Sequence, residues 1–161
     1  MRVLCCLDGS NAAHISKATA MLSTSQPLTL GLLYVIDIRP RKDIEHTRER
    51  FLRTPALPSS REKEMQQVDQ TSAQDILNEG LAHLTAAEPL LRQGRPEREI
   101  VNAAAEWGAD LVVICSRAEY DHRVPIGPKS VGHTARFVLD HAPCPVFLVR
   151  PTARDQFPID R

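Results

Sequence analysis

The first apolar run of the chain ends in a polar turn that carries a carboxylate. The run covers residues 3–7, and Asp8-Gly9-Ser10 follow it. This pattern is typical of a buried strand that leads into a helix, with Ser10 as the helix cap. A carboxylate in this place accepts hydrogen bonds either from the hydroxyl groups of a bound sugar or from backbone amides. Asp8 is therefore either a ligand contact or a local cap.

A second group of polar residues follows the apolar run 111–114 and leads into a helix that we expect near Gly132. Free amides at the start of a helix bind anions, so residues 132–134 would face a phosphate placed before this helix. A solvated basic loop explains the same residues, and both interpretations stay open. The candidate residues of this segment before the helix are Ser116, Arg117, His122, Arg123, Lys129 and Ser130.

Neither group forms a catalytic constellation. His133 is isolated in the sequence from any assigned nucleophile, and the other histidines lack the spacing of zinc ligands. The phosphate-binding motifs GxGxxG and GxxxxGK[ST] are absent after the first apolar run. A phosphate-accepting receiver domain would carry paired acids there, whereas this chain offers only Asp8. The sequence therefore predicts a binding protein rather than an enzyme, without a metal site of its own.

The cysteines are predicted to be structural. Cys5, Cys6, Cys115 and Cys144 lie in or beside apolar runs and form neither a CxxC pair nor a regularly spaced framework. In such surroundings cysteine packs as a small hydrophobic residue. We expect no disulfides.

Charge and length restrict the classes of partner. The chain has 161 residues, with 20 Lys+Arg against 20 Asp+Glu. Without a basic excess, we expect neither nucleic acid nor a membrane surface as a partner. No apolar stretch is long enough to span a membrane, and the N-terminus lacks the pattern of a signal peptide. The sequence predicts a cytoplasmic protein of one domain.

Alternating strands and helices must position the candidate residues. Apolar runs predict strands at 3–7, 28–36, 89–93, 111–114 and 145–149, and helical periodicity lies between them. This alternation predicts an α/β fold in which helices cover both faces of a parallel sheet. The predicted helical faces carry Ile15, Ala18 and Leu22, then Ala73, Ile76, Leu77, Gly80 and Leu84, then Ile100, Ala103, Ala104 and Trp107, and finally Ala135, Val138, Leu139 and Ala142.

Two segments fall outside this pattern. Residues 39–63 are rich in charge and contain three prolines, which predicts a solvated insertion before a helix that begins near Glu64. Residues 152–161 form a polar C-terminal tail. We therefore predict a single domain over residues 1–151 with a variable insertion at 39–63.

Five short motifs, in order and at fitting distances, resemble those of the universal stress protein family. The resemblance covers nearly the whole chain, and the motif before the last strand is the most distinctive. The motifs are Leu7-Asp8-Gly9-Ser10, Leu33-Tyr34-Val35, Gly94-Arg95-Pro96, Ala109-Asp110-Leu111-Val112-Val113 and His141-Ala142-Pro143-Cys144-Pro145-Val146.

The resemblance implies a three-layer α/β/α fold of the adenine nucleotide alpha hydrolase-like type, with a five-stranded parallel sheet in the order 3-2-1-4-5. It implies a homodimer, with the last strand 145–149 as the interface. Some members bind ATP or another adenine nucleotide, with Mg only as part of the bound nucleotide. The positions that the resemblance assigns to such a site are Leu7, Asp8, Gly9, Val35, Cys115, Ser116, Arg117, Gly132, His133 and Thr134.

The chain departs from the family's ATP-binding pattern at the phosphate loop, Gly-x-x-Gly-x9-Gly-Ser/Thr. Cys115 and Ala118 stand at the first two glycine positions, thirteen residues separate Ala118 from Gly132, and His133 replaces the hydroxyl residue. Glycine matters there because the backbone must approach phosphate closely. Two hypotheses follow: a regulatory stress-response protein that binds a nucleotide or another phosphorylated small molecule, or a nucleotide-free dimeric scaffold that acts through protein contacts. A third, slow nucleotide hydrolysis or adenylation, is not supported, because the sequence has neither an SGGxDS nor an HxGH signature.

Overall fold

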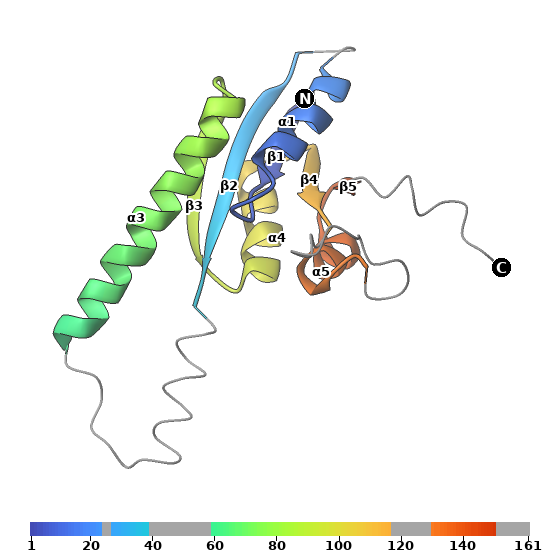
Figure 1. Ribbon diagram of the computed structural model, residues 1–161. Helices are drawn as coiled ribbons and strands as arrows, with labels where there is room; N and C mark the ends of the chain where they lie inside the picture. Colours follow the sequence, from blue (N-terminus) through green and yellow to red (C-terminus); the bar gives the residue numbers. More distant parts are fainter. Residues whose placement is uncertain (24–26, 39–58, 117–129, 151–161) are drawn as a thin grey trace, which may run out of the picture.

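The computed structural model describes residues 1–23, 27–38, 59–116 and 130–150, and the side chains from residue 64 onward in the third of these ranges. Strands and helices alternate along the chain as predicted (Figure 1). The elements are β1 (Arg2–Cys6), α1 (Ala12–Leu22), β2 (Thr29–Asp37), α3 (Ser59–His83), β3 (Glu88–Gly94), α4 (Pro96–Trp107), β4 (Leu111–Cys115), α5 (His133–His141) and β5 (Val146–Val149).

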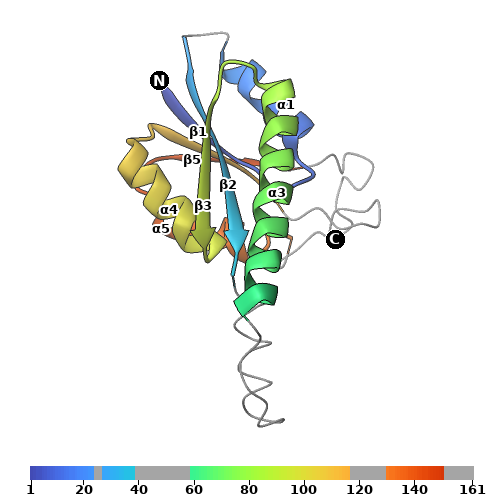
Figure 2. The same cartoon turned by 90° about the vertical axis from the view of Figure 1, so that its left-hand side faces the viewer.

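All neighbouring strands are parallel, and their order is β3-β2-β1-β4-β5. This confirms the predicted fold class and strand order. Helices α1 and α3 cover one face of the sheet, while α4 and α5 cover the other, so the molecule has three layers (Figure 2). Because β1 lies between β2 and β4, the chain reverses its direction across the sheet at β1 and β4. Ligands of doubly wound folds bind beyond the carboxyl ends of strands at such a reversal.

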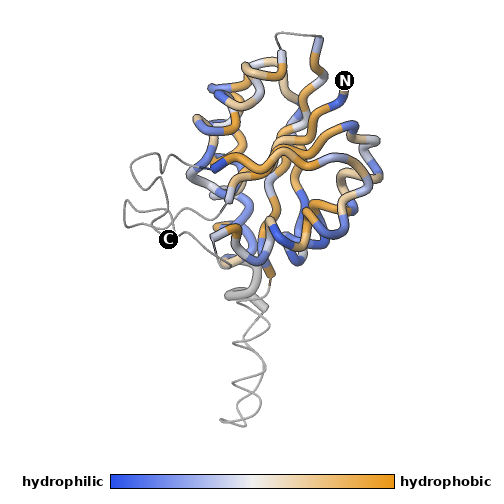
Figure 3. The backbone as a smooth tube through the Cα atoms, turned by 90° about the vertical axis from the view of Figure 1, so that its right-hand side faces the viewer, coloured by the Kyte–Doolittle hydropathy of each residue, from blue (hydrophilic) through white to orange (hydrophobic). Residues whose placement is uncertain are grey.

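The strands are hydrophobic on both faces because helices cover both. In β1, Val3 and Cys5 face the cluster under α1 and α3, whereas Leu4 and Cys6 face the cluster under α4 and α5. Successive side chains point to opposite faces of a sheet, so a strand buried on both sides reads as a continuous apolar run. Figure 3 shows this central hydrophobic layer with more polar helices around it.

The helix ends agree with the sequence at α4 and differ from it elsewhere. Pro96 is the first residue of α4, and Gly108 caps its end with a φ of 66°. The prediction for Ser10 was wrong, because Asn11 precedes α1 and Ser10 instead bonds to Asp8. Leu139 is 42% exposed, although Ala135 and Val138 beside it are buried.

Helix α3 is longer than its hydrophobic period indicates. It begins at Ser59 rather than near Glu64, so the last five residues of the predicted insertion are helical. The first buried side chain described in α3 is Ala73. The apolar residues Met65 and Val68, which precede Ala73, are exposed, so they give no buried period from which the start of the helix could be located. Residues 39–58 and 152–161 lie outside the described residues. Within the described ranges, no helix is long and apolar enough to cross a membrane.

Candidate functional site

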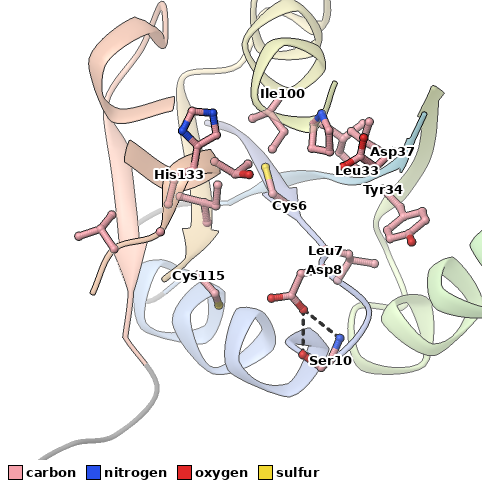
Figure 4. Close-up of a pocket in the computed structure, with 17 residues that line it drawn as sticks. Cys6, Leu7, Asp8, Ser10, Leu33, Tyr34, Asp37, Ile100, Cys115 and His133 are labelled. Atoms are coloured by element: carbon pink, nitrogen blue, oxygen red, sulfur yellow. Dashed lines mark hydrogen bonds between the residues drawn. The ribbon is translucent and has the colours of Figure 1, made fainter. Parts of the chain in front are cut away.

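A cavity of about 840 Å³ opens at the carboxyl ends of β1, β2 and β4. The beginnings of α4 and α5 complete it, through Pro96 and Gly132 respectively. Figure 4 shows His133 and Ile100 toward one side, and Asp8 and Ser10 toward the other. The volume lies within the range of small-molecule sites, roughly 300–1,000 Å³. The cavity therefore stands where the fold leads one to expect a ligand.

Side-chain hydrogen bonds hold the turn after β1. Asp8 Oδ1 accepts bonds from the Ser10 amide at 2.9 Å and from the Ser10 hydroxyl at 3.0 Å. Behind it, the buried Asn11 donates to the Cys6 carbonyl at 3.0 Å and accepts from the Asp8 amide at 3.1 Å. Gly9 has a φ of 94°, a conformation that other residues rarely adopt. The Asp8 carboxylate is thus held at the rim of the cavity by its own loop.

The end of β2 supplies a mixed apolar and acidic wall. Leu33, Tyr34, Val35 and Asp37 all line the cavity. Partial burial raises the pKa of the Tyr34 hydroxyl, and the nearby Asp8 and Asp37 carboxylates raise it further. Tyr34 therefore stays a neutral hydrogen-bonding group at physiological pH, while the two carboxylates give this side of the cavity a negative field.

The opposite wall is the beginning of α5, and it is built from backbone. Gly132 precedes the helix with φ 83° and ψ 161°, and no side chain caps the helix. The first helical bond runs from the Arg136 amide to the Gly132 carbonyl, so the amides of residues 133–135 precede this ladder. The first turn has no acidic residue. Such amides, together with the helix dipole, suit an anion.

Glu97 and two cationic side chains lie next to this wall. Glu97 is fully buried in the first turn of α4. Its Oε1 accepts bonds from Arg95 Nε at 2.9 Å and from a second guanidinium nitrogen at 2.8 Å. Nε2 of His133, whose side chain is 68% exposed, lies 3.8 Å from the same oxygen. The beginnings of α4 and α5 are therefore linked through one carboxylate.

The two cysteines that line the cavity are poor nucleophiles. Burial raises the pKa of the Cys6 thiol well above its usual value, and neighbouring cysteines add to the effect. Burial raises the pKa of Cys115 to about 11, against a smaller lowering by a hydrogen bond with Asn11. Only the thiolate attacks an electrophile. All four cysteines of the chain are free thiols.

The structure brings most of the predicted site residues together. Ser116 and Gly9 do not line the cavity: Ser116 is fully buried, and Gly9 shapes the turn. Arg117, with His122, Arg123 and Lys129, lies outside the described residues. Ser130 is buried and accepts a bond from Arg150. The predicted residues that line the cavity are Leu7, Asp8, Val35, Cys115, Gly132, His133 and Thr134.

Other lining residues were not predicted as site residues. Asp37 was recognisable as an acidic residue directly after the apolar run 28–36, whereas Tyr34 lies inside that run. In the sequence, Pro96 indicates the start of a helix and Ile100 indicates a core position, so neither pattern identifies them as site residues. The unpredicted lining residues are Cys6, Ser10, Leu33, Tyr34, Asp37, Pro96, Ile100, Ile114, Val131 and Ala135.

The groups that line the cavity differ from those of a metal site. Among the described residues, no cluster of three or more His, Cys, Asp or Glu side chains could hold a metal. The lining instead combines a carboxylate, an apolar strand end and open helix amides, which suit a hydroxyl group, an apolar ring and an anion respectively.

Comparison with known proteins gives a consistent result. Residues 1–150 match the sequence pattern of the universal stress protein family. A universal stress protein in the QAH/OAS sulfhydrylase 3' region of Thermus aquaticus is 29% identical over 148 residues, which cover 92% of this chain and 97% of that protein.

Solved structures show the same fold at lower identity. A universal stress protein in complex with cAMP has a TM-score of 0.61 at 17% identity, covering 94% of this chain and 98% of that one. A universal stress protein family protein from Arabidopsis thaliana with AMP bound has a TM-score of 0.57 at 16% identity, covering 99% and 97% of the two chains.

Proposed function

Because the chain belongs to the universal stress protein family, we propose that it is a stress-response regulatory protein that binds an adenine nucleotide in the cavity between Asp8 and α5. The observation that carries the proposal is the meeting of Asp8 and Gly132, far apart in sequence, in the lining of one cavity. Two proteins of the same fold bind cAMP and AMP respectively, which supports this class of ligand.

Each wall has a role in the proposed complex. The Ser10 bonds both go to Oδ1 of Asp8, so among the described residues Oδ2 is the oxygen available to a ribose hydroxyl. The backbone of Val35 lies along the adenine, and the first amides of α5 receive the phosphate. Bound nucleotide would thus connect β1, β2 and α5, which gives it a means of changing the surface that a partner protein meets.

The proposed activity is binding without catalysis. General acid-base or nucleophilic catalysis needs an activated side chain within reach of the reacting atom. The cavity thiols are held in their protonated form by burial. Asp8 is engaged by its own loop, and His133 approaches Glu97. These groups suit recognition of a nucleotide. We also propose that the protein is cytoplasmic.

Calorimetry and thermal melting with AMP, cAMP and ATP test this proposal. We expect at least one of them to bind and to raise the melting temperature. Asp8→Asn should weaken binding about tenfold, because a neutral amide replaces the charged acceptor of the ribose hydroxyl. The same change at the exposed Asp140 in α5 is the control and should leave binding unchanged. Absence of binding by all three nucleotides would remove the proposal.

We further propose that the protein is a homodimer through β5, an edge strand whose four apolar residues are all only half-buried. The carbonyl of Pro145 accepts a bond from Val112 in β4, and that of Val149 accepts one from Ser116 just after β4, so alternation places the Leu148 N–H on the open edge. Leu148→Pro removes this donor, whereas Leu148→Ala keeps it and makes a comparable loss of packing. Light scattering should show a dimer for wild type and Leu148→Ala, and a monomer for Leu148→Pro. Dimers in all three proteins would exclude edge pairing.

The second candidate, a nucleotide-free scaffold, is favoured by Cys115 at the first glycine position. If this candidate is right, side chains should fill the crevice, because without a ligand an apolar crevice would otherwise be open to water. The cavity of about 840 Å³ favours the nucleotide-binding function instead.

A further inference from the structure

Glu97 is a buried carboxylate behind the cavity wall, and the proposed binding mode leaves it without a role. Its neighbours on α4, Pro96 and Ile100, line the cavity, while Glu97 itself has no exposed surface. Burying a carboxylate is costly unless charged or hydrogen-bonding groups surround it. Arg95 makes two contacts with its Oε1, and His133 of the opposite wall lies 3.8 Å from the same atom.

Glu97 lies where the N-terminal, positive ends of the α4 and α5 helix dipoles come together. Glu97 lies in the first turn of α4, and His133 is the first residue of α5. Helix N-termini attract negative charge within their first turn. Glu97 therefore acts as an internal counter-ion for the α4 N-terminus and the Arg95 side chain, and it reaches toward the imidazole that borders the cavity.

We propose that Glu97 is a specificity-determining residue that restricts the cavity to nucleotides with a single phosphate group. This inference rests on the proposed nucleotide-binding function. One phosphate can occupy the first amides of α5. Additional phosphates would find the Arg95 guanidinium already paired with Glu97, so they would gain no cation at this end of the cavity. A charged group that loses its water without gaining a partner discriminates strongly against the ligand that carries it.

The discriminating experiment is calorimetric titration of AMP, ADP and ATP into wild type and Glu97→Gln. Gln keeps the shape of Glu and an acceptor for Arg95 but removes the charge. We expect wild type to bind AMP most tightly and ATP least tightly. Glu97→Gln should raise the affinity for ATP about tenfold and the affinity for AMP by less than about threefold.

The control is Glu106→Gln, which makes the same change at the opposite end of α4. Glu106 is exposed and pairs with Arg92, away from the cavity. We expect it to keep the wild-type order of affinities. The double variant Arg95→Gln/Glu97→Gln should lose most of the gain for ATP, because the released Arg95 is the cation that the longer phosphate chain would use.

The outcomes separate this inference from the proposed function. If AMP binds to wild type but the ratio of ATP to AMP affinity is unchanged in Glu97→Gln, the inference is wrong and the function stands. A wild-type preference for ATP also overturns the inference. If no nucleotide binds to any variant, both proposals fail. If Glu97→Gln does not fold, Arg95→Gln provides the test. In this variant the ratio of ATP affinity to AMP affinity should fall below that of wild type, and an unchanged ratio would contradict the inference.

Discussion

The two walls of the cavity are built by different means. At the β1 wall, the side chains of Asp8, Ser10 and Asn11 hold the turn through four hydrogen bonds. At the α5 wall, the backbone sets the geometry: Gly132 has a positive φ, and no side chain caps the helix. At the β1 wall, the hydrogen-bond donors are bonded within the turn itself. At the α5 wall, backbone amides face the cavity. Changes to the supports of the first wall, such as Asn11, should therefore cost mainly stability, whereas changes at the second wall should also lower affinity.

The largest effect on stability is expected for Asn11→Ala. The change leaves the Cys6 carbonyl and the Asp8 amide without their buried partner, and each unsatisfied group costs about 1–3 kcal/mol. We expect a loss of roughly 3 kcal/mol in the free energy of unfolding in urea. The control is Asn78→Ala on the exposed face of α3, whose amide accepts one bond from Gln74 among the described residues, and it should lose much less stability. Similar losses in the two variants would contradict the described role of Asn11.

The next effect is expected for Gly132→Ala. At φ 83° and ψ 161° the backbone lies in a region that is essentially restricted to glycine, at a cost of about 1–3 kcal/mol for other residues. Relief of this strain would rotate the first amides of α5, so nucleotide affinity should fall together with stability. Gly108→Ala is the matched control: its φ is 66°, nothing contacts the added Cβ, and it lies away from the cavity. It should lose stability but keep affinity.

A smaller effect is expected from alkaline pH, through Cys115 beneath the Asp8 wall. Its folded-state pKa is raised from 9.0 to about 11, mainly by burial. The folded state therefore holds the proton more tightly than the unfolded state. Its contribution to stability is complete below pH 9 and declines as pH rises toward 11. Melting temperatures should decrease over this interval, and Cys115→Ala should decrease less steeply. Parallel curves for the two proteins would show that Cys115 does not contribute.

Much of the fold follows from the sequence because strands covered on both faces leave continuous apolar runs. The runs in β1, β2 and β4 are of this kind, and Gly108 and Pro96 mark the ends of α4 through their backbone preferences. The start of α3 could not be predicted in the same way, because the apolar residues Met65 and Val68 in its N-terminal half are exposed. Ser10 was misjudged because a hydroxyl suits both a helix cap and the Asp8 turn.

Two sequence patterns marked parts of the candidate site: a polar residue after an apolar run, as at Asp8, and the start of a helix, as at Gly132 and Thr134. Leu7, Val35 and Cys115 were predicted only from the family resemblance. Ile100 and Ile114 could not be recognised, since a cavity-lining isoleucine and a core isoleucine have the same sequence pattern. Glu97 looked like an ordinary acidic residue in the first turn of a helix. Its burial between Arg95 and His133 depends on the packing of α4 against α5, which only the tertiary structure reveals.

The central claim is that both walls contact one ligand, and an NMR titration of ¹⁵N-labelled protein with AMP tests it most directly. We predict that the amide signals of Asp8, Val35, His133 and Thr134 shift together, with a single dissociation constant, while that of Asp140 stays in place. Shifts confined to one wall, or shifts only at residues outside the cavity, would contradict the account.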